Sequence, residues 1–157
     1  MNGDIQKFDV ETSFARVEIT VRAGSLLSLA FAGKTPGTKQ VVPMEFTGLA
    51  GRLVKYFEGR YDNFNDVSLD LTAATPFQVK VWEAARLIPY GTTRSYRWIA
   101  EQIGRPNAAR AVGQALGSNP LPVIVPCHRV VAGDGTDGGY SGGIEMKRRL
   151  LRLEGSR

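Results

Sequence analysis

The only cysteine and the only histidine of this 157-residue sequence are adjacent, as Cys127 and His128. A lone cysteine is most often a small buried hydrophobic residue, so a structural role is one interpretation. A thiol beside an imidazole can also form part of a nucleophilic site. Only a small fraction of the thiol is ionised at pH 7, and the imidazole can act as the base that raises this fraction. Such a site would further need a carboxylate that orients the histidine. The two residues alone leave both interpretations open.

The segment that carries this pair is expected to be short and buried. Residues 123–125, Val-Ile-Val, predict a buried strand or strand-like segment that leads to Cys127. Neighbouring side chains of an extended segment point to opposite faces, so His128 would act on the sulfur through a bound water unless the backbone turns there. A loop with six glycines follows at 133–143, and apolar residues at 146, 150 and 153 predict a last helix with basic residues between them.

Three short helices are expected ahead of this segment. Thr75 and Pro76 suit the start of the first helix, and Ser95 suits the N-cap of the second, whose C′ position is Gly104. Asn107 is expected to cap the third helix, at 108–116. Two short helices joined by a glycine-containing turn indicate a helix-turn-helix. The third helix consists mainly of small residues, with Arg110 and Gln114 as its main polar side chains, so it packs closely either on another helix or on DNA.

The first half of the sequence contains no cluster of catalytic residue types. Apolar and polar residues alternate at 14–21, and an apolar run follows at 26–31; together they predict two strands of an antiparallel hairpin. Apolar residues at helical spacing predict one amphipathic helix over 46–58, and 67–71 is expected to form a last short strand.

Composition and charge narrow the class of protein. With 43% hydrophobic and 22% charged residues, the chain is neither disordered nor a coiled coil. One cysteine and one histidine cannot build a zinc cluster, and no apolar run reaches the ~20 residues that a membrane span needs. Residues 1–75 hold 8 Lys/Arg and 9 Asp/Glu, whereas 76–157 hold 12 and 6. The basic second half therefore indicates either a solvated surface or a site for a polyanion such as DNA.

The second half resembles the O6-alkylguanine-DNA alkyltransferases, also called methylated-DNA–protein-cysteine methyltransferases. The match extends in order over 75–155, and its most specific part is the Pro-Cys-His-Arg core at 126–129 with its apolar flanks. The other matching stretches are Thr75–Gln78, Val81-Trp82, Ile88–Gly91, Ser95-Tyr96, Ala108–Gly113, Asn119-Pro120 and Tyr140–Gly143.

This resemblance implies a catalytic role for four residues. Cys127 would accept the alkyl group from O6 of a guanine in DNA. His128 would hold the activating water and pair with Glu154 on the last helix, which supplies the orienting carboxylate. Tyr96 would donate a proton toward guanine N3.

The resemblance also implies how substrate and DNA are bound. The alkylated base must leave the base stack to reach a buried thiol. Arg110 would fill the gap that this flipped base leaves in the duplex. Asn119 would tie the recognition helix to the active-site segment, and the carbonyls of Cys127 and Val130 would accept from the exocyclic amine. Ser141 would donate to O6. The full expected substrate set is Asn119, Val130, Tyr140, Ser141 and Gly142, and the expected DNA contacts are Arg110, Ser95, Ala109 and Gln114.

The fold implied is α+β: a ribonuclease-H-like N-terminal support domain at 1–74 with an antiparallel sheet, and a mainly helical domain at 75–157 with a winged helix-turn-helix-like motif. The expected activity is irreversible transfer of the alkyl group from O6-alkylguanine, and also O4-alkylthymine, to Cys127, with base flipping. We expect a cytoplasmic monomer whose partner is double-stranded DNA, with no cofactor, metal or membrane. Residues 1–74 contain no cysteine or histidine, so the zinc of some relatives is not expected.

Three other functions stay open as hypotheses. A non-catalytic binder of damaged DNA would lack the acceptor cysteine, which this chain has. A helix-turn-helix regulator would not need a nucleophile, and a cysteine hydrolase would turn over repeatedly.

Overall fold

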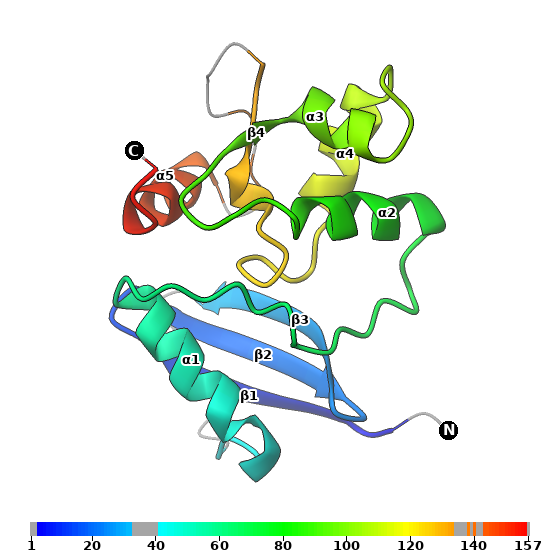
Figure 1. Cartoon of the computed structure of the whole chain (residues 1–157). Helices are drawn as coiled ribbons and strands as arrows, with labels where there is room; N and C mark the ends of the chain where they lie inside the picture. The colour runs from blue at the N-terminus through cyan, green and yellow to red at the C-terminus, as the bar shows by residue number, and fades with distance from the viewer. Residues whose placement is uncertain (1–2, 33–40, 134–137, 139, 141–142, 157) are drawn as a thin grey trace. The chain divides into compact units, whose positions relative to one another are not determined.

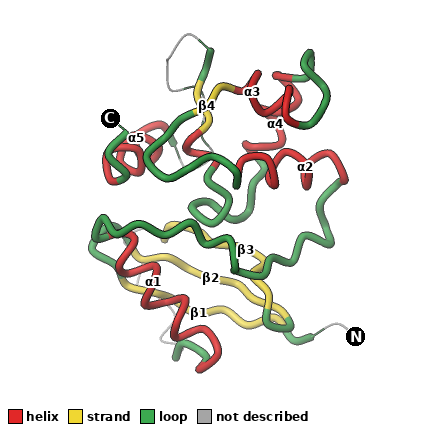
Figure 2. The backbone as a smooth tube through the Cα atoms, in the orientation of Figure 1, coloured by secondary structure: helices red, strands yellow, loops and turns green. Residues whose placement is uncertain are grey.

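The computed structural model describes residues 3–32, 41–133, 138, 140 and 143–156. The chain forms two compact units, Met1–Leu71 and Thr72–Arg157. The first contains a sheet and one long helix, and helices make up most of the regular structure of the second (Figure 2). The α+β class predicted from the sequence is confirmed. Within the described ranges, no helix has both the length and the apolar character needed to cross a membrane.

The first unit has a three-stranded antiparallel sheet, in the order β1 (Ile5–Glu11), β2 (Arg16–Arg22) and β3 (Ser25–Ala32). Ala23 and Gly24 join β2 to β3 with φ of 51° and 82°, and positive φ at both positions is the requirement of a tight type I′ hairpin turn. The expected antiparallel hairpin is therefore confirmed.

One helix lies along a face of this sheet (Figure 1). It is α1 (Thr47–Phe57), preceded by the short 3-10 helix η1 (Met44–Phe46). Its buried residues Leu53, Tyr56 and Phe57 recur at the spacing of one helical face, as the sequence predicts. Aromatic contacts join both helices to the sheet: the rings of Phe57 in α1 and Phe31 in β3 are 6.3 Å apart, and those of Phe46 in η1 and Phe8 in β1 are 5.5 Å apart.

Two features of this unit differ from expectation. Strand β1 was not predicted, because it buries only Phe8 and Val10 and leaves Ile5 58% exposed, so its alternation is too short to recognise. The short strand expected at 67–71 is wrong: Leu69 forms a single isolated bridge with Leu26 instead of a strand.

The second unit begins with α2 (Pro76–Ala85). Thr75 Oγ1 accepts from Gln78 N at 3.1 Å and Gln78 Oε1 accepts from Thr75 N at 2.9 Å, which is a reciprocal capping box. Buried Trp82 then donates from Nε1 to the Ala115 carbonyl at 2.8 Å. This bond fixes α2 to α4 (Ala109–Gly117), the third helix of the unit.

Helix α3 (Tyr96–Gln102) begins and ends as expected. Ser95 Oγ accepts from Trp98 N at 3.0 Å, and Gly104 has φ of +75° past the C-terminus. The cap expected at Asn107 is wrong. Helix α4 has Ala108 as its N-cap, with no side-chain cap bond, because a turn in which Ala108 N bonds the Arg105 carbonyl precedes it.

A short parallel ladder brings two distant segments together. Strand β4 (Arg94–Ser95) pairs with β5 (Val130–Val131), so the two residues before α3 lie beside the two residues that follow the Cys-His-Arg segment. The last helix is α5 (Ile144–Leu153). The winged helix-turn-helix and ribonuclease-H-like descriptions stay predictions.

The strand expected at 123–125 is wrong. Val125 N bonds the Leu121 carbonyl at 2.8 Å, and Pro122 and Val125 form an isolated bridge, so the segment is a buried tight turn. Val123 has φ of +75°, which is strained for a β-branched residue. Apolarity predicted the burial of this turn and gave no sign of its backbone path.

Candidate active site

Cys127 lies in a buried backbone turn. It begins the 3-10 helix η2 (Cys127–Arg129), and only 5% of its surface is exposed. Cys127 N donates to the Val125 carbonyl at 2.7 Å across Pro126, whose φ of −79° and ψ of 62° are those of an inverse γ-turn. Cys127 and His128 then lie together in the 3-10 helix, so the backbone turns at this pair instead of running extended.

The Asn119 amide holds the sulfur. Its Nδ2 donates to Cys127 Sγ at 3.1 Å and to the Val125 carbonyl at 3.0 Å, and its Oδ1 accepts from Leu121 N at 2.9 Å. Asn119 follows α4 closely, so one side chain joins the end of that helix, the buried turn and the thiol.

A buried ion pair lies behind the thiol. His128 Nε2 is 2.9 Å from Glu154 Oε2, and Arg129 reaches both carboxylate oxygens, with Nε at 2.9 Å from Oε1 and Nη2 at 2.8 Å from Oε2. Arg129 also donates to the Ile88 carbonyl at 2.9 Å. All three side chains are buried. The structure thus brings Cys127, His128 and Glu154 together, and adds Arg129.

The charges of this group fix the histidine tautomer. Burial raises the pKa of Glu154, but the hydrogen bonds from His128 and Arg129 outweigh it and hold that pKa well below its usual range. Burial lowers the pKa of His128, against the opposing effect of Glu154. A neutral imidazole facing a carboxylate donates from Nε2, so Nδ1 is left as the acceptor. Among the described residues, His128 Nδ1 has no hydrogen-bond partner.

The thiol itself is in an unfavourable place for a charge. Burial raises the pKa of Cys127, while the Asn119 hydrogen bond and the positive charge of Lys147 act against that rise. The Tyr140 hydroxyl lies beside the sulfur. Burial is the main cause that raises the pKa of Tyr140, and the charge of an ionised Cys127 raises it further, so this hydroxyl stays protonated.

The buried face of α5 differs from the one expected from residues 146, 150 and 153. Its buried residues are Lys147, Leu150 and Leu151, and Glu154 follows on the same face. Lys147, expected between the apolar positions, is fully buried, and its Nζ donates to the Val130 carbonyl at 2.6 Å. The spacing 147, 150, 151 and 154 is the signal that could have identified this face.

Helix α4 presents a narrow polar face. Val112, Ala115 and Leu116 are buried, whereas Arg110 and Gln114 are exposed and lie one turn apart on the same side. Ala109 is half-buried at the helix start. A Cβ at Gly113 would be 3.8 Å from the Tyr96 ring, so α4 and the first residue of α3 are in close contact.

The family model for 6-O-methylguanine DNA methyltransferase, DNA binding domain, matches residues 76–156, which is more than half of the chain. The chain belongs to this family. The family resemblance inferred from the sequence is therefore confirmed.

Individual family members are similar over most of the chain. The methylated-DNA–protein-cysteine methyltransferase of Mycobacterium bovis is 56% identical over 115 residues, or 73% of this chain and 68% of the relative. The crystal structure of Mycobacterium tuberculosis O6-methylguanine methyltransferase has a TM-score of 0.80 and 41% identity, covering 98% of this chain and 94% of that one. A crystal structure of Mycobacterium tuberculosis OGT in complex with DNA has a TM-score of 0.79 and 43% identity, covering 94% and 91%.

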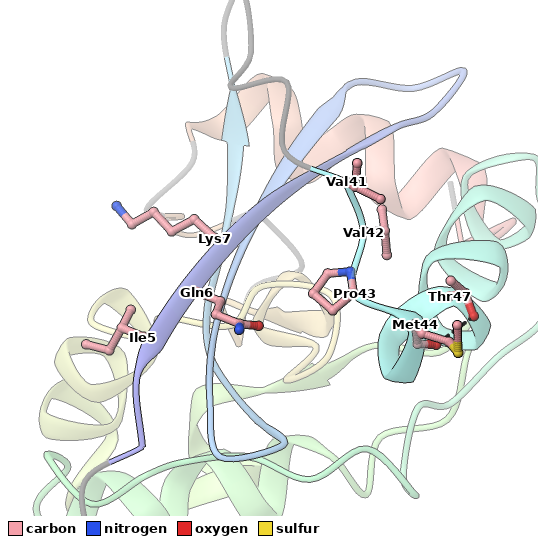
Figure 3. A pocket seen from close by; sticks show the side chains of 8 residues that line it. All are labelled: Ile5, Gln6, Lys7, Val41, Val42, Pro43, Met44 and Thr47. Carbon is pink, nitrogen blue, oxygen red and sulfur yellow. Dashed lines mark hydrogen bonds between the residues drawn. The ribbon is translucent and has the colours of Figure 1, made fainter.

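Two residues that the methyltransferase family implies, Ser141 and Gly142, lie outside the described residues. A pocket of about 990 Å³ in the first unit is lined by residues of β1, of 41–43 and of the start of η1 and α1 (Figure 3). Its lining is mostly apolar and contains no cysteine, histidine or carboxylate, so it does not compete with Cys127 as the site of methyltransferase chemistry.

Gly138 sets the space available to Tyr96. A Cβ at position 138 would lie 2.5 Å from the Tyr96 hydroxyl, and φ there is +67°. We expect Gly138→Ala to displace the tyrosine and slow alkyl transfer about tenfold or more, since displacements near 1 Å can cost about 10²-fold. Single-turnover transfer from methylated duplex DNA measures this. Gly133→Ala, where an added Cβ meets nothing within 4 Å, is the matched control, and equal slowing in both variants would contradict the prediction.

Proposed function

We propose that this protein repairs DNA by direct reversal, transferring the alkyl group from O6 of an alkylated guanine to Cys127. The observation that carries the proposal is the arrangement around the sulfur. The single cysteine of the chain receives the Asn119 amide at 3.1 Å, and the adjacent histidine is paired with a buried carboxylate. Membership of the methyltransferase family and the DNA complex of a 43% identical protein support it.

The transfer follows from the tautomer of His128. The thiol proton passes through a water to Nδ1, and the imidazolium is stabilised by the ionised Glu154. The sulfur attacks the alkyl carbon, so the S–C bond forms, the C–O6 bond breaks and the electron pair moves to the purine. Tyr96 donates its hydroxyl proton toward guanine N3. The proton on His128 returns to the tyrosinate through solvent, which leaves a neutral guanine and a thioether.

Other groups would hold the base. The carbonyls of Cys127 and Val130 accept from the exocyclic amine, Ser141 donates to O6, and Tyr140 and Gly142 complete the pocket. Asn119 positions both the thiol and the recognition helix. O4-alkylthymine presents an equivalent oxygen and is a second substrate in this proposal.

Binding to duplex DNA would use the second unit. Residues 75–157 form the DNA-binding and acceptor domain, supported by residues 1–74. Arg110, Ser95, Ala109 and Gln114 lie on or beside α3 and α4 and would contact the duplex, with Arg110 in the gap left by the flipped base. The protein would act as a monomer, in the cytoplasm of a cell whose DNA is its substrate.

Mass spectrometry after incubation with O6-methylguanine duplex DNA tests the function. We expect one added methyl on the peptide that contains Cys127 and one repaired guanine per protein, because a thioether has no good leaving group and water cannot regenerate the thiol. Repair of more than one equivalent would indicate a hydrolase. Binding without any added methyl would indicate a non-catalytic binder, and preference for one short unmodified sequence would indicate a regulator.

Arg110 provides a test of base flipping. Unstacking a base costs a few kcal/mol, so loss of a side chain that offsets this cost should slow repair in duplex DNA by about tenfold or more. We expect Arg110→Ala to slow repair in duplex DNA much more than reaction with free O6-benzylguanine, which needs no flipping. The measurement is the ratio of the two rates in wild type and variant.

Arg97→Ala is the matched control for Arg110. Its side chain is 76% exposed on the neighbouring helix α3, so the substitution removes a positive charge without touching α4. The control should lower DNA affinity slightly and leave the rate ratio unchanged. Arg110→Lys should rescue only part of the effect, because it keeps the charge and loses the planar guanidinium. A parallel fall of both rates in Arg110→Ala would show that the residue supports the fold or the thiol instead.

A further inference from the structure

The side chain of Gln78 uses both ends of its amide, and only one end serves its own helix. Its Oε1 accepts from Thr75 N at 2.9 Å and completes the capping box of α2. Its Nε2 donates to the hydroxyl of Ser118 at 3.1 Å, forty residues further along the chain. A glutamate completes a capping box equally well but has no N–H to donate, so the amide is needed only for the bond to the second helix.

Ser118 is the C-cap of α4, and two bonds from α2 meet beside it. Its Oγ donates to the Ala115 carbonyl at 2.9 Å, so its one proton is used and a lone pair accepts from Gln78. The same carbonyl accepts from Trp82 Nε1 at 2.8 Å. Gln78 and Trp82 are one turn apart on one face of α2. Helix α2 therefore holds the end of α4 at two neighbouring points, one buried and one at the surface.

This anchor lies between the residues proposed to meet DNA and the residue that holds the sulfur. Arg110, Gln114 and Ser118 follow at intervals of one turn, so Ser118 ends the exposed polar face of α4. The next residue is Asn119, which donates to Cys127 Sγ at 3.1 Å. Insertion of Arg110 into a base stack works against the cost of unstacking a base, and a helix held at a single point can turn about that point under this load.

We propose that Gln78 and Ser118 are positioning residues for repair in duplex DNA, and that the bond between them keeps α4 from turning on α2 while Arg110 displaces the base. This inference rests on the proposed function. Neither residue touches the alkyl group or the sulfur. Asn119 keeps its own three bonds to the buried turn and the thiol when Ser118 is released, so the thiol should react with a free base as before.

Four single substitutions and one double variant separate this bond from the stability of α2. Ser118→Ala removes the acceptor and leaves the capping box intact, whereas Ser118→Thr keeps the hydroxyl. Gln78→Met removes the donor together with one half of the box, so the double variant Gln78→Met/Ser118→Ala tests whether Ser118 acts through Gln78. Thr75→Ala is the matched control. It removes the other half of the box, in which Thr75 Oγ1 accepts from Gln78 N at 3.1 Å, and it leaves the bond from Gln78 to Ser118.

The measurement compares single-turnover rates with saturating O6-methylguanine duplex DNA and with free O6-benzylguanine at one fixed concentration. We expect Ser118→Ala and Gln78→Met each to slow the duplex reaction about fivefold, the typical net contribution of one hydrogen bond, and to keep the free-base rate within about twofold of wild type. The double variant should be no slower than Gln78→Met. Ser118→Thr and Thr75→Ala should keep the wild-type ratio of the two rates.

Hydrogen exchange reports on the same bond without DNA. The amides of Ser118 and Asn119 bond the carbonyls of Gln114 and Leu116 at the end of α4. Their protection should fall about fivefold in Ser118→Ala, because the end of the helix opens locally more often, and it should stay at the wild-type value in Ser118→Thr. Wild-type protection of the amides of α3 shows that each variant is folded.

Four results would overturn the inference. Unchanged protection of these amides in folded Ser118→Ala would show that the bond does not hold α4. An equal fall of the duplex and free-base rates would make the pair a support for the thiol. A rate ratio lowered as far in Thr75→Ala as in Ser118→Ala would reduce the effect to the stability of α2. Slower duplex repair when Ser118→Ala is added to Gln78→Met would show that Ser118 acts without Gln78.

The exchange measurement keeps this inference apart from the proposed function. If the proposed function is wrong, wild-type protein transfers no alkyl group from either substrate, while the protection of the end of α4 still shows whether the bond holds the helix. If Gln78→Met fails to fold, Ser118→Ala compared with Ser118→Thr still gives both the rate ratio and the protection.

Discussion

Cys127→Ser is expected to abolish alkyl transfer and to leave DNA binding intact. A serine hydroxyl is a weak nucleophile unless a strong base activates it, and this site already opposes ionisation of the more acidic thiol by burying it. The Asn119 amide, which donates to the sulfur, can donate to a serine oxygen instead, so the turn around residue 127 should persist. Mass spectrometry should detect no methyl on the variant after incubation that fully alkylates the wild type.

DNA binding provides the control for this variant. Phosphate contacts dominate affinity and give a log–log salt slope of about −0.9 per neutralised phosphate. Because residue 127 is 5% exposed and contacts no phosphate in our proposal, the slope and the affinity should match those of wild type. Alkyl transfer to Cys127→Ser would contradict the mechanism, since the chain has no other cysteine to act as acceptor. If the variant loses both DNA binding and alkyl transfer, it is misfolded.

Features that depend on local sequence were predictable. The cap at Thr75, the N-cap at Ser95 and the glycine past the end of the second helix at Gly104 each need only a few neighbouring residues, and all three are confirmed. The position of the thiol next to the only imidazole is likewise visible in the sequence. Such features are fixed by backbone preferences and by side chains within one turn.

Features that depend on tertiary contacts were not predictable in the same way. Val123 is β-branched and apolar, which favours a strand, but the bond from Val125 to the Leu121 carbonyl closes a tight turn there. Lys147 has the residue type of a solvated helix face, and only its spacing to Leu150 and Leu151 indicates burial. A polar residue that is buried against partners distant in the sequence does not fit the hydrophobic periodicity by which a buried helix face is predicted. In this protein such residues lie close to the reactive sulfur.

Helix α4 shows how both kinds of information combine. Its small residues and its exposed Arg110 follow from the sequence, but periodicity alone could not say whether another helix or DNA lies against it. The structure answers part of that question, because Trp82 of α2 bonds the Ala115 carbonyl on one side. The opposite side carries Arg110 and Gln114 in solvent, and for that side DNA remains our proposal.

Glu154→Gln is expected to impair both transfer and stability. The amide removes the negative charge that Arg129 and His128 share, and leaves a buried guanidinium without its anion. Breaking a buried ion pair costs about 3–5 kcal/mol, so the free energy of unfolding measured in denaturant should fall by about that amount. Transfer should fall about 10²-fold, because the histidine loses the carboxylate that fixes its tautomer and stabilises its protonated form.

The pH dependence identifies Glu154 as the source of this stability. Its pKa in the folded protein lies below the ordinary value of 4.5, so its ionisation stabilises the fold above about pH 4.5 and that stabilisation is lost as the pH falls further. The difference in unfolding free energy between wild type and Glu154→Gln should therefore be full at pH 7 and shrink at acid pH. His128, whose pKa is lowered in the fold, adds a loss of stability that begins as pH falls below about 6.5.

Glu145→Gln is the matched control on the same helix. Its carboxylate is 72% exposed and 3.4 Å from Arg152, so its loss should change stability by no more than about 1 kcal/mol and leave transfer unaffected. If Glu154→Gln unfolds at the same denaturant concentration as Glu145→Gln at pH 7, the buried pair does not stabilise the fold. If it also transfers methyl at the wild-type rate, Glu154 does not orient His128, and Nδ1 has to be held as the acceptor by another group.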